Sequence, residues 1–231
     1  MLNSILFVAE NIGIIAFAVS GAMLGAQKNL DIFGIIVLGI VTALGGGVIR
    51  DLLLGINPPA MFTNYTAVTL AVLSSCLIFL IYRFMHRLKI SGRVDYHALV
   101  NFFDAIGLGV FSVSGVNVAI NAGYTDTPLL AVTVGVITGI GGGMIRDLLS
   151  GEIPSVLHKN VYALPAILGA SLYYVLAILQ VNSLLSVLAA FSLIFGIRMA
   201  ATYFRWQLPR PQPVYKDYYK NNRKYLHKRH K

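Results

Sequence analysis

One eleven-residue motif occurs twice in the chain, and it limits the possible folds more than any other feature. The motif reads Gly-Gly-Gly-x-Ile-Arg-Asp-Leu-Leu-x-Gly and covers residues 45–55 and 141–151, each time inside a long apolar run. A glycine costs about 1 kcal/mol relative to alanine in a helix interior, so three in succession predict a broken or sharply bent helix. The two predicted breaks fall at Gly45, Gly46, Gly47, Gly141, Gly142 and Gly143.

The chain as a whole has the composition of an integral membrane protein. Of its 231 residues, 57% are hydrophobic and 12% are charged, against about 25% charged in a soluble domain. Apolar stretches of about 20 residues, the length that crosses a bilayer core, recur throughout. Glu10 interrupts the first stretch and no basic segment precedes it, so we expect a retained span rather than a cleaved signal peptide. The pattern predicts seven spans, at residues 5–24, 32–56, 67–82, 98–120, 129–149, 161–181 and 184–204.

The duplication extends well beyond the glycines. The segment Phe-Ala-Val-Ser-Gly at residues 17–21 matches Phe-Ser-Val-Ser-Gly at 111–115, and Glu10 matches Asp104 at the same offset. Spans one to three and four to six are therefore two copies of one unit. Three is odd, so the second copy enters the membrane the other way round. Inverted repeats with helices broken at corresponding positions indicate a transport site near the middle of the bilayer.

These observations define the predicted fold. We expect an all-α integral membrane protein with seven transmembrane helices, in which helices 2 and 5 are broken at the glycine triplets. One transmembrane channel domain covers residues 1–205 and a basic cytoplasmic tail covers 206–231. Within the domain, the first repeat spans about 3–87, the second about 96–181, and the seventh helix 184–205.

The basic residues are distributed as a membrane protein requires. The formal net charge is +9, and eight of the eighteen Lys and Arg lie in the tail. Most of the others flank the spans, which favours contact with anionic lipid over nucleic-acid binding. The positive-inside rule then predicts that the N-terminus is outside and the C-terminus cytoplasmic.

Backbone at a helix break offers two kinds of ligand. The preceding half-helix exposes carbonyls, which suit a cation, and the following half exposes amides, which suit a carboxylate. We expect Ser20, Ser114, Thr42 and Thr138 to lie near the same depth and to line one polar path with the glycines. The alternative is close helix packing through small residues, as in Gly-xxx-Gly pairs.

Each triplet is followed by an arginine and an aspartate. Neighbours in sequence point about 100° apart on a helix, so Arg50 need not pair with Asp51. The inverted repeat predicts cross-pairing instead, Arg50 with Asp147 and Arg146 with Asp51. These pairs either contact the permeant species or act as an interhelical link.

The other intramembrane acids are Glu10 and Asp104. Both are candidates for attracting cations to the interior, and the alternative is a protonated, hydrogen-bonded carboxyl. We expect Arg198, outside the repeat, to be structural and to snorkel to the cytoplasmic face. The five histidines show no ligand spacing, and neither a nucleophile–base constellation nor a phosphate loop is present, so we expect no cofactor, no metal beyond a permeant monovalent cation, and no enzyme.

The doubled motif, the three-plus-three-plus-one span count and the Leu-His-Lys-Asn-Val-Tyr-Ala-Leu segment at 157–164 together resemble the prokaryotic TRIC family, homologues of the trimeric intracellular cation channels, whose repeat is also labelled a glycine-transporter domain. The resemblance covers residues 3–205. It implies a homotrimer in a prokaryotic plasma membrane, with a pore in each protomer between kinked second and fifth helices, conducting K⁺ and less selectively Na⁺.

Three functions remain open at this point. The leading one is a passive monovalent cation channel, favoured by carbonyl-ended half-helices and hydroxyls around one axis. The alternative is a secondary transporter for glycine or another small zwitterion, whose carboxylate the amide ends would hold. The third is a structural or signalling membrane protein whose tail recruits lipid or a partner.

Overall fold

The computed structural model describes residues 2–87, 95–158 and 161–206, and within these ranges the chain is helical, without strands. The expected tail lies almost wholly outside the described residues. The helices, in chain order, are α1 (Leu2–Gln27), α2 (Ile32–Leu53), α3 (Ala60–Thr63), α4 (Tyr65–Arg87), α5 (Tyr96–Asn121), α6 (Pro128–Leu149), α7 (Ser155–His158), α8 (Ala163–Ile178) and α9 (Ser183–Tyr203).

Each predicted span coincides with one of the longer helices. Among the described residues, six helices (α1, α2, α4, α5, α6 and α9) are long and apolar enough to cross a membrane. The sixth predicted span corresponds to α8, which has 16 residues and is shorter than expected. Its first turn contains Pro165, which a helix tolerates there because the first amide groups have no intrahelical partner.

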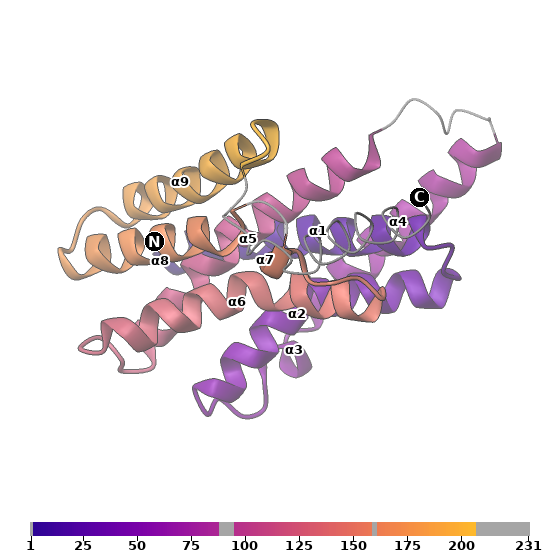
Figure 1. Cartoon of the computed structure of the whole chain (residues 1–231). Helices are drawn as coiled ribbons and strands as arrows, with labels where there is room; N and C mark the ends of the chain where they lie inside the picture. Colours follow the sequence, from indigo (N-terminus) through magenta and orange to yellow (C-terminus); the bar gives the residue numbers. More distant parts are fainter. Residues whose placement is uncertain (1, 88–94, 159–160, 207–231) are drawn as a thin grey trace, which may run out of the picture.

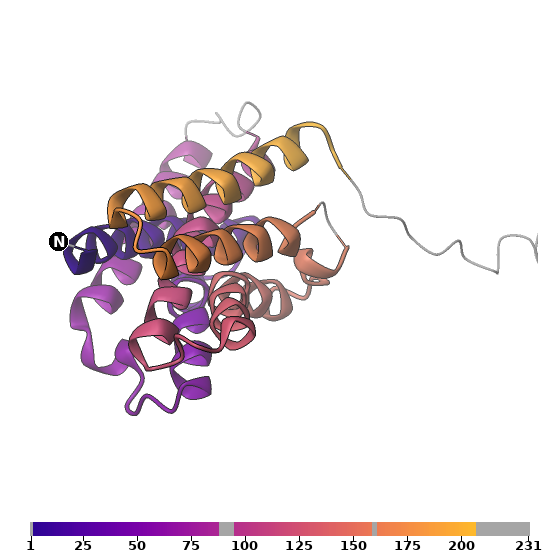
Figure 2. The same ribbon diagram turned by 90° about the vertical axis from the view of Figure 1, so that its left-hand side faces the viewer.

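The centre of the molecule is formed by four helices that belong to the two repeats (Figure 1). Helices α1 and α2 pack on each other, α5 and α6 do the same, and α1 also contacts α5 while α2 contacts α6. The remaining longer helices lie outside this centre: α4 against α1 and α2, α8 against α5 and α6, and α9 against α5 and α8 (Figure 2). In Figure 1, α1 and α5 run in opposite directions, and so do α2 and α6.

Local signals fix the ends of α2 and α6. The Asp31 side chain accepts a hydrogen bond from the amide of Gly34 at 2.7 Å and caps the start of α2. Pro128 opens α6 at its first turn. Both helices stop just before the last glycine of the motif, since Gly55 and Gly151 have φ of +70° and +73°, which favour glycine.

The predicted helix breaks are wrong. Both α2 and α6 continue as α-helix through their glycine triplets. A side chain at Gly46 would overlap the carbonyl oxygen of Thr138, and one at Gly142 would overlap that of Thr42. The glycines therefore let the backbones of α2 and α6 touch where the helices cross. This tertiary packing offsets the low intrinsic helix propensity that the prediction relied on.

Candidate functional site

The arginine and aspartate of each motif pair within their own copy. Asp51 Oδ1 accepts hydrogen bonds from Nε and Nη2 of Arg50, both at 2.8 Å. Asp147 Oδ1 accepts them from Nε and Nη2 of Arg146, at 2.9 and 2.8 Å. The second carboxylate oxygen holds the backbone beyond the helix, with Asp51 Oδ2 2.8 Å from the Ala60 amide and Asp147 Oδ2 2.7 Å from the Ser155 amide.

The predicted pairing between repeats, Arg50 with Asp147 and Arg146 with Asp51, is therefore wrong. Helices α2 and α6 cross at Gly46 and run in opposite directions (Figure 1), so their later residues move apart beyond the crossing. At 1.5 Å of rise per residue, Arg50 and Asp147 lie about 13 Å apart along the helix axes. The long arginine side chain instead turns toward its own neighbour.

Two serines make polar contacts between the repeats. Arg146 Nη1 donates to Ser20 Oγ at 2.6 Å and to Asp104 Oδ1 at 2.9 Å, so one guanidinium joins α6, α5 and α1. In the other half, Ser114 of α5 donates to the Glu10 carboxylate of α1. Ser20 and Ser114, which we expected to line a polar path, thus each contact a charged side chain of the other repeat, and that they line a path stays a prediction.

A further cation, from α9, lies against the second repeat. Arg198 of α9 is 2% exposed, its Nη2 lies 3.9 Å from Asp104 Oδ2, and its guanidinium carbon lies 4.3 Å from the ring centroid of Tyr162. The expectation that Arg198 snorkels to the membrane surface is wrong, because a buried carboxylate and an aromatic face hold it inside. Arg146 and Arg198 together balance the formal charge of Asp104 and Asp147.

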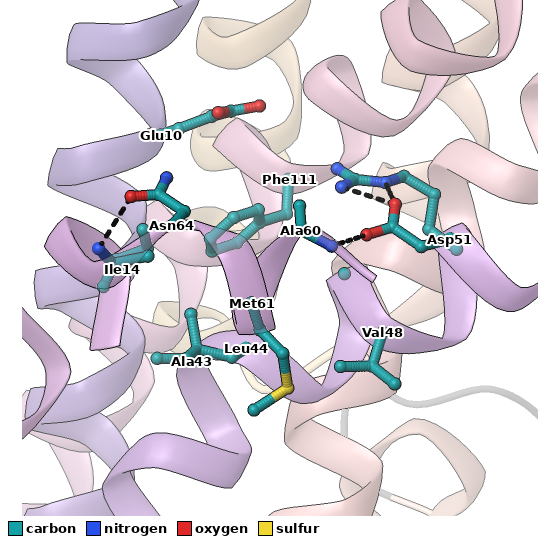
Figure 3. A pocket seen from close by; sticks show the side chains of 13 residues that line it. Glu10, Ile14, Ala43, Leu44, Val48, Asp51, Ala60, Met61, Asn64 and Phe111 are labelled. Carbon is teal, nitrogen blue, oxygen red and sulfur yellow. Dashed lines mark hydrogen bonds and ion pairs between the residues drawn. The ribbon is translucent and has the colours of Figure 1, made fainter. Parts of the chain in front are cut away.

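The first repeat contains a cavity in the corresponding place. Its volume is about 70 Å³, enough for a few water molecules. Figure 3 shows the Phe111 ring between Glu10 and Asn64 on one side and Asp51 on the other. Two acids, Glu10 and Asp51, line it against one arginine, Arg50, so its formal charge is −1. A charge of this sign attracts cations.

The six glycines have three different surroundings. Gly46 and Gly142 form the backbone crossing, while Gly45 and Gly141 face Ile145 and Ile49 of the opposite helix. Of the six, Gly47 is the glycine that lines the cavity, and an added Cβ there would find only Arg50 Nη2, at 3.9 Å.

The equivalent Gly143 is packed. An added Cβ there would lie 3.0 Å from Tyr162 Oη and 3.4 Å from Asp104 Oδ1.

The threonines are also enclosed, because Thr42 and Thr138 donate to the carbonyls of Leu38 and Val134 in their own helices, at 2.5 and 2.6 Å. Their hydroxyl protons are not directed at the cavity.

Several residues of the site were not predicted. Phe111 lines the cavity and stacks on its repeat counterpart Phe17, with ring centroids 5.3 Å apart. Asn64 and Tyr162 also belong to the site, yet neither stands out in an apolar sequence. The duplication of Phe17 and Phe111 at one offset was a usable signal. Within the described residues no group of three His, Cys, Asp or Glu side chains is placed to hold a metal ion.

Comparison with known proteins places these features in a family. The family model described as "Glycine transporter" matches the chain twice, at residues 7–83 and 101–177. The "UPF0126 inner membrane protein YadS" of Escherichia coli (strain K12) is 38% identical over 205 residues, which is 87% of this chain and 92% of the relative. The "UPF0126 membrane protein YvgT" of Bacillus subtilis (strain 168) is 38% identical over 199 residues, 86% and 92% of the two chains.

Solved structures agree with this relationship. A structure from "Structural basis for conductance through TRIC cation channels" has a TM-score of 0.77 and 37% identity, with 89% of this chain and 97% of that chain covered. The trimeric intracellular cation channel orthologue from Rhodobacter sphaeroides has a TM-score of 0.80 and 30% identity, with 87% and 98% covered. The chain is therefore a multi-pass membrane protein of the glycine-transporter-domain family, and within that family it belongs with the prokaryotic TRIC proteins.

Proposed function

We propose that the protein is a monovalent cation channel that conducts K⁺, with the pathway inside each protomer beside α2 and α6. The cavity of formal charge −1 next to Gly47 carries the proposal, because it places ionisable side chains and space for water within the bundle. Intramembrane ionisable groups of this kind mark ion pathways. The solved relatives described as TRIC cation channels support the same function.

In this proposal side-chain carboxylates attract the cation, and backbone carbonyls do not. Continuous helices leave no free carbonyls at the triplets, so the cation is attracted by Glu10 and Asp51. The second half of the path is closed by Arg146, which bridges Ser20, Asp104 and Asp147. In this proposal the bridge is the closed arrangement, and conduction requires the guanidinium to leave Ser20.

The glycine-transporter alternative has lost its physical basis. It required amide groups freed by a helix break to hold a carboxylate, and α2 and α6 keep their helical hydrogen bonds through the triplets. The negative formal charge of the cavity also disfavours the carboxylate of a zwitterion.

We further propose seven spans, an inverted relation between the repeats and a homotrimer in the prokaryotic plasma membrane. The opposite directions of α1 and α5 in Figure 1 support the inversion. Lys28, Arg83 and Arg205 support a cytoplasmic C-terminus through the positive-inside rule, and the tail is proposed to contact anionic lipid. Cys76 is the sole cysteine, so a Cys76→Ser background allows each loop to be tested with a single introduced thiol.

Planar bilayers containing the purified protein test the function. In asymmetric KCl we expect unitary currents that reverse near the K⁺ equilibrium potential, without added glycine. Reversal near the Cl⁻ potential, or saturable glycine uptake without unitary currents, would overturn the proposal. The Arg83→Gln variant is the matched control, because Arg83 is exposed on α4 and outside the cavity.

A further inference from the structure

Corresponding residues of the two repeats have different surroundings. Glu10 and Asp104 correspond in the repeat, as do Gly47 and Gly143. In the first repeat these residues border the cavity, and the space beside Gly47 is open. In the second repeat, Tyr162 Oη and Asp104 fill the space beside Gly143.

The second-repeat cluster also contains a cation from outside the repeats. Arg198 comes from α9, which follows the two repeat units. Its Nη2 lies 3.9 Å from Asp104 Oδ2, and no hydrogen bond joins these two groups. Among the described residues, Asp104 Oδ2, Tyr162 Oη and Arg198 Nε and Nη1 are buried without a hydrogen-bond partner. The guanidinium is held there by charge and by the aromatic face rather than by directed hydrogen bonds.

The first-repeat cavity and the second-repeat cluster also differ in formal charge. With Arg198, the second-repeat cluster has two arginines and two aspartates and a formal charge of zero. Without Arg198 it would carry −1, the formal charge of the first-repeat cavity. At the first-repeat cavity Asp51 is buried and Glu10 is half-buried, so the uncompensated negative charge is partly removed from water and favours a cation beside it.

We propose that each protomer has one site for a permeant monovalent cation, at the Glu10 carboxylate in the first-repeat cavity, and that Arg198 permanently occupies the equivalent place beside Asp104 as a tethered cation. The inference rests on the proposed channel function. The ion is monovalent because one positive charge neutralises the cavity. Oxygen ligands are available from Glu10 and from waters, for which the cavity has room.

Thallium(I) replaces K⁺ in such sites and scatters X-rays anomalously, so it reports occupancy directly. In crystals of the full chain grown with a thallium(I) salt, we expect one anomalous peak per protomer, in contact with the Glu10 carboxylate. Glu10→Gln should remove this peak, since the amide oxygen still accepts from Ser114 but the charge is gone. Arg198→Gln should add a second peak beside Asp104.

A double variant provides the control for the second peak. Arg198→Gln with Asp104→Asn restores the formal balance, so it should show the Glu10 peak alone. If Arg198→Gln does not fold, the wild-type protein and Glu10→Gln still decide the proposal. A wild-type peak beside Asp104, or a peak at Glu10 that survives Glu10→Gln, would overturn it.

Conductance separates this inference from the proposed function. We expect Glu10→Gln to raise the half-saturating K⁺ concentration of the unitary current roughly tenfold, because a charge–charge attraction at close range is lost. Unitary cation currents in the wild type without an anomalous peak at Glu10 would overturn the site and leave the channel. A peak at Glu10 in a protein that passes no current would overturn the channel and leave the site.

Discussion

Arg146 donates a hydrogen bond to Ser20, a residue 126 positions earlier, over 2.6 Å. The bond joins the second repeat to the first helix of the first repeat, at the point where we place the closed end of the path. Ser114, the repeat counterpart of Ser20, instead donates to the Glu10 carboxylate of the first repeat. Of these two serine contacts between the repeats, only the one made by Ser20 engages an arginine.

Removing the Ser20 hydroxyl should favour the open pathway. In Ser20→Ala, Arg146 loses its ligand on α1 and keeps those on α5 and α6. A hydrogen bond to a charged group contributes about 1.5–3 kcal/mol, so we expect the open probability in single-channel recordings to rise about tenfold or more. Ser112→Ala is the control, since the buried Ser112 hydroxyl has no hydrogen-bond partner among the described residues. An unchanged open probability in Ser20→Ala would contradict the proposal that the hydrogen bond from Arg146 to Ser20 holds the pathway closed.

The glycine crossing can be tested by adding a single methyl group. Gly46→Ala would push against the Thr138 carbonyl and separate α2 from α6. Overpacking of this kind costs about 1–3 kcal/mol, so the thermal unfolding temperature in detergent should fall. Gly47→Ala is the matched control, because open space surrounds that position and alanine has the higher helix propensity. Equal unfolding temperatures for the two variants would contradict the crossing.

A double-mutant cycle distinguishes the two pairings of the arginines. Arg50→Ala leaves Asp51 buried without its cation, which should cost about 3–5 kcal/mol of stability. The coupling energy of Arg50 with Asp51 should be large, whereas that of Arg50 with Asp147 should be within about 0.5 kcal/mol of zero. Chemical denaturation in mixed micelles measures both couplings, and the opposite ranking would restore pairing between the repeats.

The contact of Gly143 with Tyr162 predicts a rescue. Gly143→Ala places a methyl group 3.0 Å from Tyr162 Oη and should lower the unfolding temperature. Tyr162→Phe removes a hydroxyl that is buried without a hydrogen-bond partner among the described residues, so alone it should be nearly neutral. Combined with Gly143→Ala, it should recover most of the lost stability. Additive losses in the double variant would contradict this contact.

Much of the fold could be read from the sequence because its determinants are local or repeated. Apolar length located the long helices, and the offset that relates Glu10 to Asp104 revealed the duplication. The glycine triplets were misread as breaks because helix propensity is a local quantity. The benefit of Gly46 comes from the Thr138 carbonyl, 92 residues later in the chain, which no local rule includes.

The sequence predicts which charged residues belong to the site but does not predict which of them form ion pairs. Arg50, Asp51, Arg146 and Asp147 were expected together near the triplets, and they do lie at the ends of the crossing helices. Which partner each guanidinium takes depends on where α2 and α6 cross and on side-chain reach. The position of Arg198 depends on how α9 packs against the repeats. Because α9 has no repeat counterpart, the sequence offers no pattern that predicts this packing.

The two motif aspartates hold structure on both sides of the helix end. Asp51 binds the Arg50 guanidinium with one oxygen and the Ala60 amide with the other, and Asp147 does the same with Arg146 and the Ser155 amide. Each carboxylate thus joins an interior guanidinium to the first residue of a short helix, α3 or α7. The short helices α3 and α7 are therefore linked through one side chain each to the charged centre of the bundle.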